Sequence, residues 1–427
     1  MVFPPRMSEP ATSRQDSLAA LRLPDVRRYA IGKLLATFAA QMQAIAVGWQ
    51  LYERTHSAWA LGLTGLVEVV PALLLALPAG HLADRLDRRR IAMVSQALLS
   101  VTALGLALVS FLSGPVWIIY LLLFVSGVGV AFTAPASNAL LAQLVPPEHF
   151  ANSNAWLSSG RQLSAMAGPA FAGLLIAATG TATLSYALQA AFGLAFVIAL
   201  ASVRRLRAAQ EVVENGSSEK SFKDIFAGLR FVWRHEVFLA AITLDLFAVL
   251  LGGATALLPI FAKDILHVGA GGLGLLRAAP SLGAFVMALV TVRLPPWKKP
   301  GQTLLWVVAG FGLATIGFGL SHTFVLSLLM LFLTGLFDNV SVVIRITLEQ
   351  VLTPDAMRGR VGAIHWVFIG LSNELGAFES GATAALFGPL WSVILGGIGT
   401  LVVVALVAGR WKELSRLRPF SDLEPGE

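Results

Sequence analysis

Residues 80–112 read GHLADRLDRRRIAMVSQALLSVTALGLALVSFL, and this stretch decides the fold. Its first part, residues 80–90, is dense in Asp and Arg, whereas residues 91–112 contain no charged side chain. A helix needs roughly 20 mostly apolar residues to cross the hydrocarbon core of a bilayer. The apolar part shows no alternation of polar and apolar positions, which argues against a membrane β-barrel. The stretch therefore predicts a charged turn followed by a transmembrane helix.

The composition of the whole chain agrees with a lipid environment. The chain has 427 residues, of which 56% are hydrophobic and 13% are charged, with a net charge of +7. Soluble domains have about 25% charged residues, so the composition excludes an ordinary soluble enzyme and a disordered protein. Cysteine is absent, which excludes disulfides and thiolate metal sites. We attribute the positive charge to membrane-flanking loops and expect no nucleic-acid partner.

Charges, Pro and Gly divide the chain into apolar runs of helical length. The predicted fold class is an all-α membrane protein with twelve transmembrane helices. The spans are 29–51, 57–82, 90–112, 115–142, 152–178, 182–203, 237–262, 270–292, 302–321, 323–349, 360–385 and 388–409.

The distribution of Lys and Arg predicts the orientation. With the N-terminus inside, 25 of the 31 basic residues fall in cytoplasmic segments, and only Arg54 and Lys263 fall in outer loops. This asymmetry places both termini in the cytoplasm. Residues 1–28 have no apolar core, so we expect no cleavable signal peptide. The expected location is the inner (plasma) membrane, with lipid as a partner.

One long polar segment splits the chain into two halves. We expect a cytoplasmic tail at 1–28, a six-helix bundle at 29–203, a linker at 204–236 with an interfacial helix, a second six-helix bundle at 237–409 and a cytoplasmic tail at 410–427. The sequences AQLVPPE (142–148) and EQVLTPD (349–355) follow the fourth and tenth spans at an offset of 207 residues. Parallel repeats of this kind are known in transporters.

The loop GHLADRLDRRR is the candidate gate. Gly80 would allow close helix approach, Asp84 could pair with a neighbouring helix N-terminus, and the arginines could pair with acids on adjacent helices. Such contacts can form in one conformation and break in another. The alternative is a positively charged anchor for lipid headgroups. The gating candidates are Gly80, Asp84, Arg85, Arg88, Arg89, Arg345, Glu349 and Arg358.

These residues resemble a signature of the major facilitator superfamily. The match is Gly80-x-Leu82-Ala83-Asp84-Arg85-x-x-Arg88-Arg89, with Asp87 where the family usually has Gly. GPAFAG (168–173) resembles a shortened Gly-Pro motif of exporters, through Gly168, Pro169 and Gly173. The segments 244–266, 343–363 and 369–381 are similar to the enterobactin-exporter-like branch. The resemblance implies a twelve-helix secondary transporter that exports small molecules against proton entry.

Ionisable residues inside the spans are functional candidates independently of that resemblance, because each is costly at the bilayer centre. Proton coupling needs a carboxyl group that alternates between its protonated and charged forms. The candidates are Asp245, Glu374, Glu68, Glu379 and Asp338. The alternative for each acid is a satisfied contact between packed helices.

Asp338, Arg345 and Glu349 form one stripe on the tenth span, because they are seven and four residues apart. Arg345 and Glu349 are interpreted mainly as a structural ion pair or an inner gate, and Asp338 as a possible cation-binding residue. The candidates for a substrate pocket are Gln41, Arg161, Phe247, Trp366 and Asn373. Arg161 and Arg277 could pair with a buried acid or an anionic substrate, whereas snorkelling to the headgroups is the alternative, favoured for Arg277 and Lys33.

The sequence favours a proton-coupled exporter of a siderophore-like or drug-like molecule. A facilitator or importer of a similar molecule and a non-transporting receptor or scaffold are the alternatives. No phosphate loop, zinc-protease spacing or nucleophile elbow is present. We therefore expect no enzyme activity, no cofactor and no metal site. A monomer is expected, because each half supplies a partner for the other.

Overall fold

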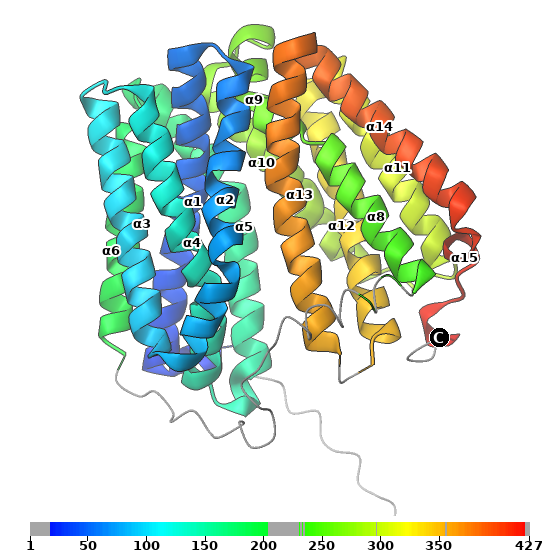
Figure 1. Ribbon diagram of the computed structural model, residues 1–427, viewed down its shortest axis with the longest axis horizontal. Coiled ribbons are helices and arrows are strands. Elements are labelled where there is room, and N and C mark those ends of the chain that lie inside the picture. Colours follow the sequence, from blue (N-terminus) through cyan, green and yellow to red (C-terminus); the bar gives the residue numbers. More distant parts are fainter. Residues whose placement is uncertain are drawn as a thin grey trace, which may run out of the picture.

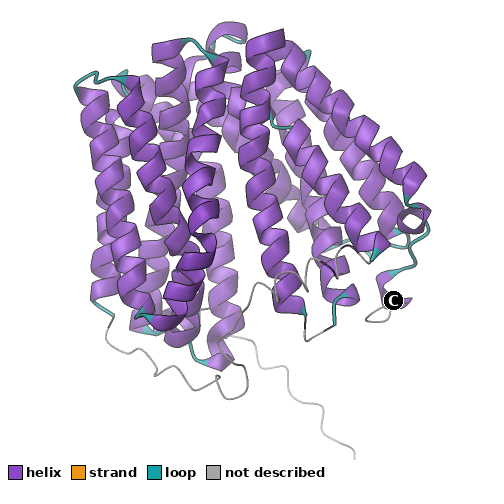
Figure 2. Ribbon diagram, viewed as in Figure 1, coloured by secondary structure: helices purple, strands orange, loops and turns teal. Residues whose placement is uncertain are grey.

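The structure is a computed structural model that describes residues 18–203, 230, 233, 235–295, 297–354 and 357–422. Over these residues the chain forms helices and no strand, in agreement with the predicted class (Figure 2). The predicted interfacial helix of the linker lies almost wholly outside the described residues. Figure 1 shows two groups of long helices side by side, the N-terminal half in blue to green and the C-terminal half in green to red.

The N-terminal half contains six long helices. They are α1 (Pro24–Thr55), α2 (Ala58–Arg85), α3 (Arg88–Phe111), α4 (Val116–Leu144), α5 (Pro147–Thr179) and α6 (Thr183–Ala201), preceded by the short 3₁₀ turn η1 (Ala20–Arg22). Local chemistry sets their ends. Ser57 caps α2 by accepting from Ala60 N, Asp87 caps α3 by accepting from Arg89 N, and Gly180 ends α5 at a positive φ of 69°.

The described residues of the C-terminal half also form six spans. They are α8 (Glu236–Leu251) with its continuation through η2 (Ala254–Leu257), α9 (Leu258–Ile260) and the π-helical η3 (Phe261–Ile265), then α10 (Gly269–Thr291), α11 (Pro300–Gly319), α12 (Phe324–Leu352), α13 (Arg358–Phe387) and α14 (Pro389–Arg410). Two short elements, α15 (Lys412–Ser415) and η4 (Phe420–Asp422), follow.

The seventh span differs from the single helix predicted over 237–262, because α8 stops before Gly252 and Gly253. A side chain on Gly252 would lie 2.6 Å from Phe311 Cε1, and one on Gly253 would lie 2.8 Å from Gly376 O. The absence of side chains therefore lets neighbouring helices approach the break closely. A glycine pair also weakens the helix at that point.

Length and hydropathy qualify eleven described helices as membrane spans. The twelfth, α13, has 30 residues but is more polar, since it carries Asn373, Glu374 and Glu379. It packs along α2 of the other half. The more polar helix thus lies between the two halves, where lipid does not surround it on every side.

The hydrophobic cores show how the halves meet. We call the end of the bundle where α1 begins and α14 ends the terminal end, and the opposite end the distal end. One cluster includes Leu51 and Leu106 of the N-terminal half together with Phe261 and Leu273 of the C-terminal half. Two other clusters each belong to one half only. The halves therefore share a core near the distal end and have separate cores near the terminal end.

Candidate transport site and gates

Two glycine pairs bring the halves together at the distal end. A Cβ on Gly381 of α13 would lie 2.4 Å from Gly62 Cα of α2. A Cβ on Gly173 of α5 would lie 2.8 Å from Gly274 Cα of α10. Both helix pairs join opposite halves, and their arrangement follows the internal repeat of the chain. Backbones can approach this closely only where side chains are absent.

The same interface is open toward the terminal end. Gly370 lies three turns before Gly381 on the same face of α13, and Gly80 lies five turns after Gly62 on the same face of α2. Among the described residues, no atom outside the helix's own nearby backbone lies within 4 Å of a Cβ at either position. The expectation that Gly80 permits close helix approach is thus not met in this conformation. The α2 and α13 faces that touch near Gly62 and Gly381 have separated there.

Side-chain bonds add to the distal contact. Tyr52 of α1 donates a hydrogen bond to Asp264 of η3, and the Lys263 ammonium lies 5.8 Å from the centroid of the Trp49 ring. Sequence reasoning missed Tyr52 and Asp264. The available signal was the adjacent Lys263–Asp264 pair in an outer segment that is otherwise almost free of basic residues. These contacts fasten α1 to the seventh span across the two halves.

The Gly-Pro motif positions α5 between two neighbours. A Cβ on Gly168 would lie 2.7 Å from Gln41 Cβ of α1, and the carbonyl of Pro169 would lie 2.5 Å from a Cβ on Gly274. Gly168 thus serves contact within the N-terminal half. Pro169 and Gly173 serve contact with α10 of the other half, where the Gln162 amide also donates to Ser281 O at 2.9 Å.

Glu374 lies within electrostatic range of two ionisable residues, one on each side of the interface between the halves. Glu68 of α2 and Glu374 of α13 repel each other, and Arg277 of α10 attracts Glu374. A Cβ on Gly65 would lie 3.1 Å from Glu374 Oε2, so α2 lies directly beside that carboxylate. We call Glu68, Glu374 and Arg277 the interface cluster. With both acids ionised it carries one net negative charge in a site of low polarity.

A second group of charges lies inside the C-terminal half. Asp245 of α8 forms an ion pair with Arg345 of α12, and the two residues are 8% and 4% exposed. Arg345 Nε also donates to Ser341 Oγ at 3.2 Å. The predicted partner of Arg345 was Glu349 on the same helix. The observed partner is Asp245 on α8. Glu349 is half-buried one turn further along α12.

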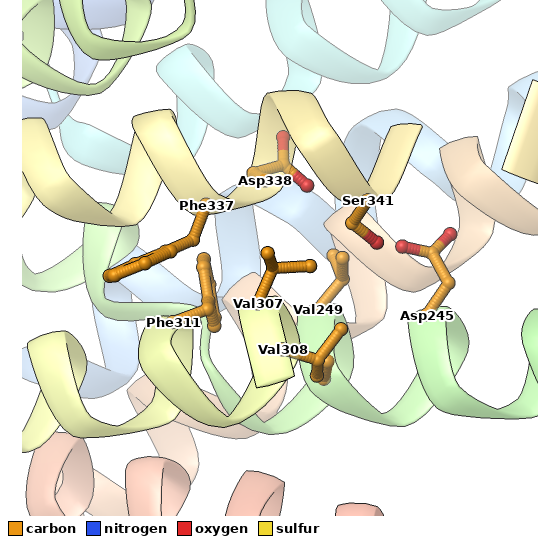
Figure 3. Close-up of a pocket in the computed structure, with 9 residues that line it drawn as sticks. Asp245, Val249, Val307, Val308, Phe311, Phe337, Asp338 and Ser341 are labelled. Atoms are coloured by element: carbon orange, nitrogen blue, oxygen red, sulfur yellow. The ribbon is translucent and has the colours of Figure 1, made fainter. Parts of the chain in front are cut away.

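A small cavity of about 20 Å³ adjoins this pair. Figure 3 shows Ser341 between Asp338 and Asp245, with Phe311 and Phe337 at the other end of the cavity. The volume is that of about one water molecule. Asp338, half-buried, can therefore be hydrated beside the ion pair, and its role in binding a cation stays a prediction.

The arginines of the GHLADRLDRRR loop have divided roles. Arg89 Nε donates to Leu200 O at 2.8 Å, and its Nη2 donates to Ala201 O, so Arg89 caps the end of α6 within its own half. This contact differs from the predicted pairing with an acid. Arg90 is exposed and lies 3.5 Å from Asp87, and Arg88 is half-buried. The side chains of Asp84, Arg85 and Arg358 lie outside the described residues.

The pocket candidates differ in their surroundings. Gln41 is half-buried against Gly168, Phe247 and Asn373 are exposed, and the Asn373 amide donates to Ile369 O of its own helix. Arg161 is exposed on α5, Glu379 is half-buried on α13, and the Trp366 side chain lies outside the described residues.

Comparison with known proteins identifies the family. Residues 29–377 match the Major Facilitator Superfamily. The chain is 28% identical to the enterobactin exporter EntS of Shigella flexneri over 397 residues, which cover 92% of this chain and 93% of that protein. It is 27% identical to EntS of Citrobacter koseri over 412 residues, 95% and 97% of the two chains.

Solved structures agree in fold. A bacterial homolog of the human lysosomal transporter Spinster, in an inward-facing and occupied conformation, has a TM-score of 0.71 at 14% identity, covering 92% of this chain and 96% of that one. The nucleoside transporter NupG has a TM-score of 0.70 at 13% identity, with coverages of 90% and 98%. With two six-helix halves and a family match over most of its length, the chain belongs to the Major Facilitator Superfamily and is a multi-pass membrane transporter.

Proposed function

We propose that the chain exports a small molecule, siderophore-like or drug-like, by proton antiport and alternating access. This proposal places both termini in the cytoplasm, because 25 of the 31 basic residues fall in the segments that the sequence predicts to be cytoplasmic. The distal contacts then close the outer side, and the separation at Gly80 and Gly370 opens the inner side. The similarity to proteins named as enterobactin exporters supports export.

The observation that carries proton coupling is the position of the interface cluster between the halves. Rocking of the halves moves Glu68 relative to Glu374 and Arg277, because Glu68 belongs to the N-terminal half and the other two belong to the C-terminal half. A cluster with one net negative charge is costly to enclose, whereas protonation of one acid makes it neutral. Protonation therefore changes the cost of bringing the halves together, which is the requirement for coupling.

Glu374 and Glu68 are the proton carriers of this proposal. Asp245 is assigned a structural role because its charge is already paired with Arg345 inside one half. A rocking motion of the two halves does not separate α8 from α12, because both belong to the C-terminal half. The Asp245–Arg345 ion pair therefore stays closed during the cycle of this proposal. Asp338 and Glu379 remain secondary candidates.

Transport of enterobactin into proteoliposomes tests the proposal. An acid-inside pH gradient should drive accumulation, because protons leaving the vesicle exchange for the substrate. Glu374→Gln should reduce accumulation to the level measured without a gradient. Glu413→Gln, a matched change of an exposed acid in α15, should behave as wild type. Equal accumulation with and without the gradient in the wild type would rule out proton antiport.

A further inference from the structure

Two cations in the N-terminal half are unaccounted for by the proton pathway. Lys33 lies on α1 and Arg161 on α5, both within spans. They are close enough to repel each other. Among the described residues no carboxylate forms an ion pair with either one. Two mutually repelling charges inside a membrane protein are costly, and a bound anion would lower that cost.

The helix face of Arg161 points away from lipid. Leu163 and Leu174 are exposed and lie on one side of α5. Arg161 lies about 140–160° round the helix from them, on the side that carries Ala172 and Ile176. Those two residues are buried in the distal core. Arg161 is exposed on this inward side because it lies in the part of α5 nearer the terminal end, where the halves have separate cores.

The helix face of Lys33 has the same character. Lys33, Thr37, Ala40 and Ala44 follow one another along one face of α1, and the two alanines are exposed. A lipid-facing surface is different: α3 exposes large apolar side chains, namely Val94, Val101, Leu104 and Leu108. The small and polar surface of α1 therefore faces the space between the halves rather than lipid.

Contacts with buried residues of its own half fix the position of the Lys33 ammonium. Its ammonium lies 3.3 Å from Ser137 Oγ of α4 and 5.8 Å from the Phe196 ring centroid of α6. A Cβ on Gly160, the neighbour of Arg161, would lie 3.2 Å from Leu34, the neighbour of Lys33. The two cations thus come from helices in direct contact, at one level of the bundle.

We propose that Lys33 and Arg161 form an anion-binding subsite, with Ser137 as an adjacent hydroxyl, open toward the terminal end. The subsite takes a carboxylate, phosphate or sulfonate group. This subsite rests on the proposed function. The anionic group belongs either to the exported molecule or to a lipid headgroup that enters the same space. Guanidinium and ammonium groups together provide two charge-assisted contacts to such an anion.

Binding of two isosteric probes to the purified full chain tests the subsite. Radiolabelled 1-naphthoate is an anion, whereas 1-naphthamide is neutral and of similar shape. The wild type should bind naphthoate about tenfold more tightly than naphthamide. Arg161→Gln and Lys33→Gln should each remove this preference without weakening naphthamide binding. Arg161→Lys should keep it, and so should Arg293→Gln, the loss of an exposed cation at the terminal end.

A measurement on the wild type does not depend on variants that fold. Sulfate, added at constant ionic strength, should displace naphthoate but not naphthamide. Failure of the wild type to bind naphthoate, equal binding of both probes, or a preference that survives both Gln variants overturns the subsite.

Two further arms separate the alternatives. Weaker naphthoate binding in nanodiscs that contain phosphatidylglycerol than in phosphatidylcholine alone supports the subsite with a lipid phosphate as occupant, and equal binding supports it with the exported molecule as occupant. No proton gradient is present in these assays. If the wild type shows no gradient-driven enterobactin transport but still prefers naphthoate, the result contradicts proton coupling and leaves the subsite supported.

Discussion

The hydroxyl of Tyr52 donates a hydrogen bond to the carboxylate of Asp264, a residue 212 positions away in the other half of the chain. This bond lies at the distal end, where the glycine pairs also join the halves. It contributes nothing to the stability of either half alone. Its energy therefore bears directly on the equilibrium between the conformation described and one that opens at the distal end.

Tyr52→Phe should favour opening of the distal end. A hydrogen bond to a charged group contributes about 1.5–3 kcal/mol, which corresponds to at least about tenfold in population. The chain has no cysteine, so Ala254→Cys, buried in the distal core, reports opening through its rate of maleimide labelling. We expect about tenfold faster labelling in Tyr52→Phe. Tyr120→Phe removes a hydroxyl bond to Ala60 O within one half and should leave the rate unchanged. Equal rates in both variants would contradict a role of Tyr52 in closure.

Gly381→Val should block closure of the distal end. The added atoms would overlap Gly62 Cα, and overpacking costs about 1–3 kcal/mol even where neighbours can move. We expect transport to be lost while the protein remains monodisperse in detergent. Gly409→Val places the same side chain in α14, where no atom of a described neighbour lies within 4 Å of a Cβ, and should transport as wild type. A wild-type rate in Gly381→Val would show that the glycine contact is dispensable.

Asp245→Asn should lower the melting temperature strongly. It leaves the Arg345 charge buried without its partner, a change that costs about 3–5 kcal/mol. The double variant Asp245→Leu/Arg345→Met removes both charges and should recover most of that loss, as replacement of a whole buried pair often does. Thermal unfolding of the purified variants measures both effects. If the single variant is as stable as wild type, the pair has no structural role and Asp245 becomes a candidate proton carrier again.

Arg89→Ala should destabilise the N-terminal half. It removes donors from the last carbonyl groups of α6, together with a favourable charge at that helix end, for a loss of about 1–2 kcal/mol. Arg90→Ala, one residue further in the same motif, alters an exposed side chain and should stay within about 0.5 kcal/mol of wild type. Melting temperatures compare the two. Equal losses would mean that the α6 contact contributes little.

The predicted spans agree with the helices because long apolar runs and the interruptions between them are local properties. The run at 91–112, for example, corresponds to α3 (Arg88–Phe111). The break at Gly252 and Gly253 was open to prediction as a bend, since paired glycines weaken a helix, but its position beside Gly376 depends on α13. The partner of Arg345 could not be predicted, because helical spacing points to Glu349 on the same helix whereas Asp245 lies 100 positions earlier.

The sequence by itself determined a membrane protein of twelve spans in two halves, because the hydropathy of each run is a local property of its residues. It also determined which charges lie within spans, and so which residues are costly and need an explanation. Only the tertiary structure decided which of those charges meet. Glu68, Glu374 and Arg277 come from three helices in two halves, and Lys33 and Arg161 come from two helices in one. Their grouping depends on glycine contacts and helix faces that form only after the spans have packed.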